Sequence, residues 1–145
     1  MSKIAIGVDL GGTRIKTVVV DGKGGLLYEE YTPTNDGNEN WKQTIQGFID
    51  QAKNNLGISN YVVGISAPGI PDDKNGAIEF MPGRLQGLEN FNWSSYLNKK
   101  TWVLNDAVAA LMAEATLGSA RDKKNVVMLT LGTGVGGAIL IDGKP

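Results

Sequence analysis

The stretch that decides the fold is KIAIGVDLGGTRIKTVVVDGKGGLLYEEYT, residues 3–32. Its β-branched and apolar residues fall in three runs, at residues 3–8, 14–20 and 25–32, and such runs predict strands. The connections are short, so consecutive strands must pair antiparallel as a meander. The first connection combines an acid, two glycines and a hydroxyl, namely Asp9, Gly11, Gly12 and Thr13.

Beyond this meander the pattern alternates between helix and strand. Apolar residues from Trp41 to Leu56 recur at helical spacing, and Gly57 stands where a C-terminal cap belongs. Further predicted elements are strands at 61–65, 101–104, 126–131 and 138–141, helices at 91–97 and 105–117, and a hairpin around 77–81. Three antiparallel strands followed by alternating helices and strands predict an α/β fold with a mixed sheet. This pattern suits the ribonuclease-H-like lobe of an actin-type ATPase.

The last predicted hairpin lies outside that lobe. We expect residues 1–121 to form the amino-terminal lobe and residues 122–145 to begin a second, similar lobe, represented only by its first hairpin. The chain ends just after an Asp142-Gly143 turn that leads to no further element, so we expect either a fragment or a gene product that lacks its second lobe.

Composition excludes several kinds of chemistry. The 145 residues carry a formal net charge of −1 and contain neither cysteine nor histidine. Disulfides, thiolate nucleophiles and a serine-histidine triad are therefore excluded, and so is a histidine or cysteine metal site. The basic residues are not clustered, so we expect no nucleic-acid partner. No signal peptide opens the sequence and no apolar run could span a membrane, which indicates a cytoplasmic protein without a membrane partner.

The first turn is open to a functional and a structural interpretation. Glycines allow a phosphate to approach backbone amides, and the hydroxyl of Thr13 adds a donor. Asp9 would repel that phosphate unless a divalent cation lay between them, which favours a Mg²⁺ role. The structural alternative is that Asp9 hydrogen-bonds its own backbone as a turn residue.

The second glycine-rich turn, GTGVGG at residues 132–137, contains a G-x-G-x-x-G pattern. In a dinucleotide-binding fold this pattern opens a helix and is followed by an acid about 20 residues later. Here it leads into the β-branched run AILID, and the sequence ends too early for that acid. A glycine turn without a ligand is the other alternative. In an actin-type ATPase, two such turns would hold the phosphates of one nucleotide from opposite lobes.

Four segments in order resemble the ROK family of sugar kinases, which includes many bacterial glucokinases: GVDLGGTRIK (7–16), GISAPGIPDDKNGAI (64–78), NDAVAALMAEATLGSA (105–120) and LTLGTGVGGAILIDGK (129–144). The resemblance implies an ATP-dependent transfer of the γ-phosphate to a hexose hydroxyl. It implies Asp106 as the general base, with Asn105, Asp106, Pro68 and Gly69 at the sugar. It also implies a phosphate site made by Gly11, Gly12, Thr13, Gly132, Thr133, Gly134, Gly136 and Gly137, with Asp9 helping to hold Mg²⁺.

Other readings of the same residues remain. Asn and Asp are preferred helix N-caps, so capping alone explains one member of Asn105-Asp106. The family's sugar-sensing repressors carry a DNA-binding segment before the kinase-like part, for which we expect no room ahead of Lys3. The third alternative is an actin-like ATPase lobe without sugar chemistry.

Two motifs of the ROK family are absent from this sequence. The family's glutamate-histidine sugar motif and its cysteine-histidine zinc motif are both missing, so a structural zinc is expected only in a missing part. We therefore expect residues 1–145 alone to be inactive. We also expect the unpaired edges of the last hairpin to favour a homodimer.

Overall fold

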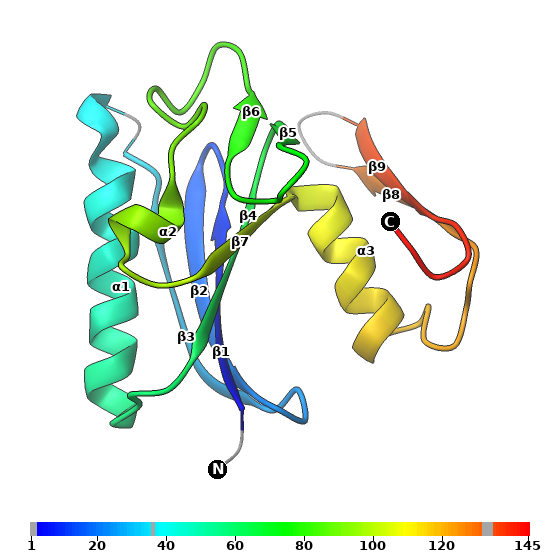
Figure 1. The fold of residues 1–145 in the computed structure, drawn as a ribbon, viewed down its shortest axis with the longest axis horizontal. Helices are drawn as coiled ribbons and strands as arrows, with labels where there is room; N and C mark the ends of the chain where they lie inside the picture. Colours follow the sequence, from blue (N-terminus) through cyan, green and yellow to red (C-terminus); the bar gives the residue numbers. More distant parts are fainter. Residues whose placement is uncertain (1–2, 36, 132–134) are drawn as a thin grey trace. The chain divides into compact units, whose positions relative to one another are not determined.

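The computed structural model describes residues 3–35, 37–131 and 135–145. It divides into two compact units, Met1–Leu104 and Asn105–Pro145. Figure 1 labels the elements of both units.

Unit 1 is built on a five-stranded sheet in the order β3-β2-β1-β4-β7. Its strands are β1 (Ile4–Leu10), β2 (Arg14–Asp21), β3 (Leu26–Pro33), β4 (Val62–Ala67) and β7 (Thr101–Asn105). β2 pairs antiparallel with both β1 and β3, whereas β4 pairs parallel with β1. The predicted mixed sheet, with its antiparallel meander, is therefore confirmed.

One face of this sheet forms the core of unit 1. Ile6, Val8 and Leu10 alternate with less buried residues along β1 and have almost no exposed surface. Helix α1 (Asn40–Leu56) covers this face with a buried stripe of Trp41, Ile45, Ile49 and Ala52. The helix ends at Gly57, which has a left-handed φ of 62° and donates its N–H to the carbonyl of Lys53. The predicted helix and its glycine cap are both confirmed.

Short elements complete unit 1 after strand β4. These are β5 (Ile70–Pro71), β6 (Ile78–Phe80) and α2 (Trp93–Tyr96), and a 3₁₀ turn, η1 (Gly37–Glu39), precedes α1. The predicted hairpin near residues 77–81 exists, but its second strand is the earlier segment Ile70–Pro71. An aromatic cluster of Trp41, Phe91 and Trp93 anchors α2, with ring centroids 4.9–5.6 Å apart.

Unit 2 consists of helix α3 (Asp106–Leu117) and a hairpin of β8 (Val126–Leu131) and β9 (Val135–Leu140). β9 begins three residues earlier than predicted, so Gly136 and Gly137 are strand residues opposite Thr130 and Leu129, and the prediction that they belong to the turn is wrong. Glycine is needed at these two strand positions because atoms of β8 lie too close for a Cβ. A Cβ at Gly136 would lie 2.7 Å from the Thr130 hydroxyl, and one at Gly137 would lie 2.7 Å from the carbonyl oxygen of Met128.

The core of unit 2 is small. Ala107 and Leu111 of α3 pack against Ala138 and Leu140 of β9. Since α3 packs on this hairpin, the contacts divide the chain at Leu104–Asn105, whereas the lobe boundary after residue 121 stays a prediction. In the part of the chain that the structure describes, no helix is long and apolar enough to cross a membrane.

Candidate active site

The turn between β1 and β2 is pinned from the end of β3. Gly11 donates its N–H to the carbonyl oxygen of Arg14 at 3.0 Å, which closes the turn. The hydroxyl of Thr34 donates to the Gly11 carbonyl at 2.6 Å, and the Thr34 N–H donates to the carbonyl of Thr13 at 2.8 Å. A side chain that follows the meander therefore fixes the predicted phosphate turn in one conformation.

The two glycines of this turn leave space for different groups. A Cβ at Gly11 would lie 2.8 Å from the backbone oxygen of Arg14, so the turn itself excludes a side chain there. A Cβ at Gly12 would instead lie 2.9 Å from a guanidinium nitrogen of Arg84. Gly11 thus serves the fold, while Gly12 leaves room for a charged group from a distant loop.

Asp9 lies at the carboxyl end of β1, beside the end of the parallel strand β4. Its register partner on β4 is Ser66, and the Ser66 hydroxyl donates to Asp9 Oδ1 at 2.6 Å. Asp9 is exposed, because it points to the sheet face opposite the core. Ligands of open α/β sheets bind outside the carboxyl ends of the parallel strands, and the Asp9 carboxylate lies at such an end.

A Mg²⁺ ion fits this arrangement in one respect. Mg²⁺ usually keeps several waters and takes one or two carboxylates together with substrate phosphates, rather than a complete protein cage. Asp9 can supply such a carboxylate. Among the described residues there is no cluster of three or more acids, cysteines or histidines that would form a cage.

The predicted sugar loop begins where β4 ends. Pro68 is half-buried, and Gly69 has a left-handed φ of 104°. A Cβ at Gly69 would lie 2.6 Å from the carbonyl oxygen of Phe80, so close packing on β6 already requires a glycine there. The contribution of Pro68 and Gly69 to sugar binding stays a prediction.

Asn105 and Asp106 mark the start of α3. The side-chain oxygen of Asn105 accepts hydrogen bonds from the N–H groups of Ala107 and Val108, at 3.0 and 3.3 Å, and so caps the helix. Asp106 is exposed, and its Oδ1 accepts from the N–H of Ala107 at 2.8 Å. The capping interpretation is thus confirmed for Asn105. Asp106 uses only Oδ1 in the hydrogen bond given above, so its Oδ2 takes no part in that bond. The roles of both residues toward a sugar stay predictions.

The second predicted phosphate turn is described only in part. Gly132, Thr133 and Gly134 lie outside the described residues. Gly136 and Gly137 belong to β9, as given above, so any contact they make with a phosphate would come from a strand rather than from a turn.

The sequence analysis did not identify three residues that contact Asp9 or the Gly11–Thr13 turn, namely Ser66, Thr34 and Arg84. Ser66 could have been found, because alternation along β4 places it on the same sheet face as Asp9 once the two strands are taken as parallel neighbours. Thr34 and Arg84 gave no local signal, since they reach the turn from segments 21 and 72 positions away from Thr13 and Gly12.

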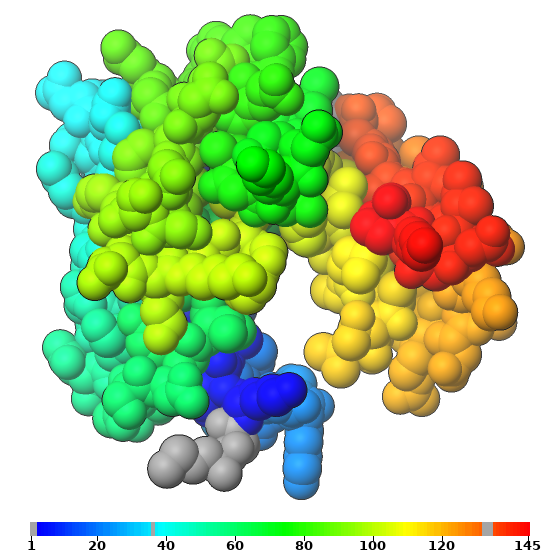
Figure 2. All heavy atoms as spheres, viewed as in Figure 1, coloured from blue at the N-terminus to red at the C-terminus, as the bar shows by residue number. Residues whose placement is uncertain are grey.

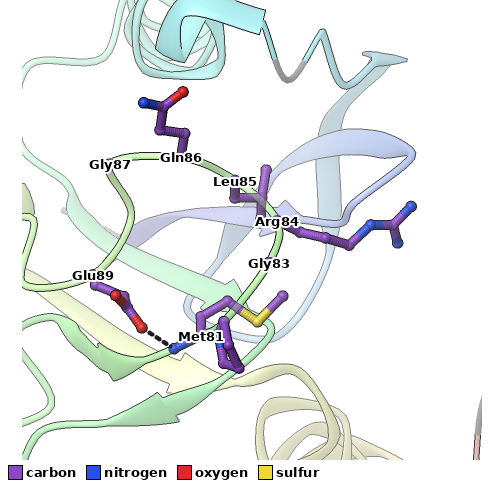
Figure 3. Close-up of a pocket in the computed structure, with 8 residues that line it drawn as sticks. Met81, Gly83, Arg84, Leu85, Gln86, Gly87 and Glu89 are labelled. Carbon is purple, nitrogen blue, oxygen red and sulfur yellow. Dashed lines mark hydrogen bonds between the residues drawn. The ribbon is translucent and has the colours of Figure 1, made fainter.

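Arg84 belongs to the loop that follows β6. This loop lies on the surface of unit 1 (Figure 2) and borders a pocket of about 440 Å³ lined by residues 81–87 and Glu89. The Glu89 carboxylate accepts a hydrogen bond from the Met81 N–H at 2.7 Å across the loop. The Arg84 side chain extends away from Glu89 (Figure 3).

The fold is that of a ribonuclease-H-like lobe, as found in actin-type ATPases. The chain belongs to the ROK family, whose model matches residues 5–145. Its sequence is 33% identical over 150 residues to a glucokinase of Streptomyces coelicolor and 32% identical over 142 residues to a β-glucoside kinase of Listeria monocytogenes. The alignments cover 97% and 94% of this chain, but only 44% and 46% of those relatives.

A solved structure gives the same result. The ROK family glucokinase from Streptomyces griseus, in complex with glucose and AMPPNP, superposes with a TM-score of 0.84 at 32% identity. The match covers 97% of this chain and 45% of that one. The chain therefore spans a little under half the length of the relatives to which it is similar.

Proposed function

We propose that this chain provides the first nucleotide and sugar-binding part of an ATP-dependent sugar kinase that phosphorylates a hexose hydroxyl. The observation that carries the proposal is the pairing of Asp9 with Ser66 beside a pinned glycine turn, at the carboxyl ends of two parallel strands. The ROK family membership of residues 5–145 and the similarity to named glucose and β-glucoside kinases support it.

In this proposal the chemistry needs one base. Asp106 accepts the proton of the sugar hydroxyl, whose oxygen then bonds to the γ-phosphorus while the bond to the bridging oxygen breaks and ADP leaves. The carboxylate is suited to this because it is exposed, and because Asn105 takes over the capping of the helix. Asp106 is thereby held at a fixed position in the first turn of α3, which pre-organises it.

The phosphates bind at the first turn in this proposal. The backbone amides of the Gly11–Thr13 turn and the hydroxyl of Thr13 would donate to the phosphate oxygens. Asp9 would help to hold Mg²⁺, and a bound Mg²⁺ would supply charge neutralisation for the transferred phosphoryl group. Ser66 fixes the rotamer of the Asp9 carboxylate through its hydrogen bond.

The test is kinetic and uses the intact protein that carries residues 1–145. Asp106→Asn should reduce turnover with hexose at least about 10³-fold and leave the binding of Mg²⁺ with AMPPNP within twofold, because removing the base affects only the chemical step. ADP release coupled to a dye reports turnover, and calorimetry reports binding. Residues 1–145 alone should show no turnover above the Asp106→Asn background.

The matched control is Asp122→Asn, which changes a 91% exposed acid of the 118–125 connector, outside the four segments that resemble the family. This variant should keep normal turnover. Near-normal turnover in Asp106→Asn would refute the assignment of the base, whereas failure of the intact protein to phosphorylate any of glucose, mannose, N-acetylglucosamine or a β-glucoside would refute the kinase itself.

A further inference from the structure

Arg84 brings a positive charge to the Gly11–Thr13 turn from the loop that follows β6. Its Nη1 lies 2.9 Å, and its Cζ 3.4 Å, from the position that a Cβ of Gly12 would occupy. The flat guanidinium therefore covers the bare backbone of Gly12. Both residues belong to unit 1, so the contact lies within one compact body.

The loop holds Arg84 in place through its neighbours. Leu85 and Leu88, which follow Arg84, are almost completely buried in the core of unit 1, and the Leu88 N–H donates to the Leu85 carbonyl at 3.0 Å. Leu85 adopts a left-handed φ of 52°, flanked by Gly83 and Gly87 at 86° and 78°. A leucine in this region is uncommon and costs conformational energy, which the burial of its side chain offsets.

The charge of Arg84 has no acidic partner inside the described part of the chain. None of the ion pairs among residues 3–35, 37–131 and 135–145 includes it. The one acid that shares its pocket, Glu89, points its carboxylate at the Met81 amide instead. A guanidinium offers five N–H donors in a planar fork that matches the oxygens of a phosphate.

We propose that Arg84 is a phosphate-binding residue, which pairs with phosphoryl oxygens held at the Gly11–Thr13 turn. The inference rests on the proposed function for the presence of a phosphate at this turn, and it adds a cationic ligand from the β6–α2 loop. The same chemistry serves the terminal phosphate of the nucleotide and a free polyphosphate, so both serve as probes.

The experiment titrates the 145-residue chain with three probes in the presence of Mg²⁺: AMPPNP, inorganic tripolyphosphate and adenosine. Arg84→Gln should weaken AMPPNP and tripolyphosphate about tenfold or more, because it removes a charge-assisted contact, and should leave adenosine within twofold. Arg84→Lys should lie between the two, since lysine keeps the charge but loses the fork. Arg121→Gln, an exposed arginine of the 118–125 connector, is the matched control and should bind like the original chain.

A second variant tests the contact itself. Gly12→Ala should push the guanidinium away without straining the backbone, because its Cβ meets only the far end of the Arg84 side chain and Gly12 has no left-handed φ. If Arg84 acts through this contact, Gly12→Ala and Arg84→Gln should each weaken AMPPNP, and the double variant should be no weaker than Arg84→Gln alone. Thermal unfolding should be unchanged in Arg84→Gln.

The outcomes separate the two proposals. Equal AMPPNP affinity in Arg84→Gln and the original chain would overturn the role of Arg84 while leaving the nucleotide site intact, and so would effects of the two substitutions that simply add. A loss that is equally large for adenosine would overturn it as well, because adenosine carries no phosphate. If the original chain binds none of the three probes, the proposed function of this lobe fails, and the inference fails with it.

Discussion

The two compact units differ in how completely they cover their apolar residues. In unit 1 the inner face of the sheet lies under α1 and the aromatic cluster, so that Ile6, Leu10 and Trp41 have no exposed surface. In unit 2 only one face of the β8–β9 hairpin packs on α3. The other face presents large apolar side chains, with Leu131 81% and Leu129 68% exposed.

This difference indicates that the two units depend on different sources of stability. A sheet of several strands with a helix on its face buries enough apolar surface to be stable alone, whereas a two-stranded hairpin with one small helix is marginal. A contiguous apolar face of this kind usually marks a surface that another body covers. We therefore expect unit 1 to determine the free energy of unfolding and unit 2 to determine association.

The largest effect should come from the core of unit 1. Trp41→Ala removes a fully buried side chain that contacts Phe91 and Trp93, and it should lower the free energy of unfolding by about 3–5 kcal/mol. Trp102, at 41% exposed, is the matched control, and Trp102→Ala should cost less than about 1 kcal/mol. Urea unfolding followed by circular dichroism measures both. Equal costs for the two tryptophans, which both belong to unit 1, would contradict the view that burial in its core is what stabilises this unit.

A smaller effect on stability, but a larger one on association, should come from the exposed apolar face of the β8–β9 hairpin, which carries Leu129 and Leu131. Leu129→Lys places a charge there, and it should abolish or weaken self-association of the chain while changing the free energy of unfolding by less than about 0.5 kcal/mol. Sedimentation velocity at several concentrations measures the association. The matched control is Leu26→Lys, which changes a leucine of β3 that is 58% exposed in unit 1 and should leave association unchanged. A homodimer that persists equally in both variants would place the contact elsewhere.

Much of unit 1 could be predicted because its signals are local. The alternation around Val8 and Val19 fixes the meander, and the helical stripe from Trp41 ends at a glycine that needs a left-handed φ. Asn105 could be predicted as a cap for the same reason, because a side-chain amide that accepts from the next turn is a local interaction.

The errors and omissions involve contacts with another strand or loop, which the pattern within a single segment does not reveal. Gly136 and Gly137 look like turn residues in isolation, and only the approach of Thr130 and Met128 across the ladder explains them as strand glycines. In the sequence, Arg84 looks like an ordinary charged residue of a surface loop. Its position over Gly12 depends on the burial of Leu85 and Leu88, which sequence periodicity in an irregular loop does not reveal.

The smallest predicted effect compares one carboxylate in each unit, Asp21 in unit 1 and Glu114 in unit 2. Hydrogen bonds from the N–H groups of Gly25 and Lys23 hold the pKa of Asp21 below its ordinary value of 3.8, and those from the Ser119 N–H and hydroxyl hold the pKa of Glu114 below 4.5. Both pKa values are lower in the folded state than in the unfolded state. Each ionised carboxylate therefore stabilises the folded state at pH values above its ordinary pKa, and this stabilisation is lost as the pH falls through the folded-state pKa.

Carboxyl carbon NMR titration should therefore give midpoints below 3.8 for Asp21 and below 4.5 for Glu114. Ser119→Ala removes the hydroxyl donor to Glu114 and should raise the pKa of Glu114 toward its ordinary value, while the titration of Asp21 stays unchanged. An unchanged midpoint for Glu114 in Ser119→Ala would mean that the Ser119 N–H alone holds the carboxylate. A shift of Asp21 in the same variant would show that the two units titrate together, against the separation on which the comparison rests.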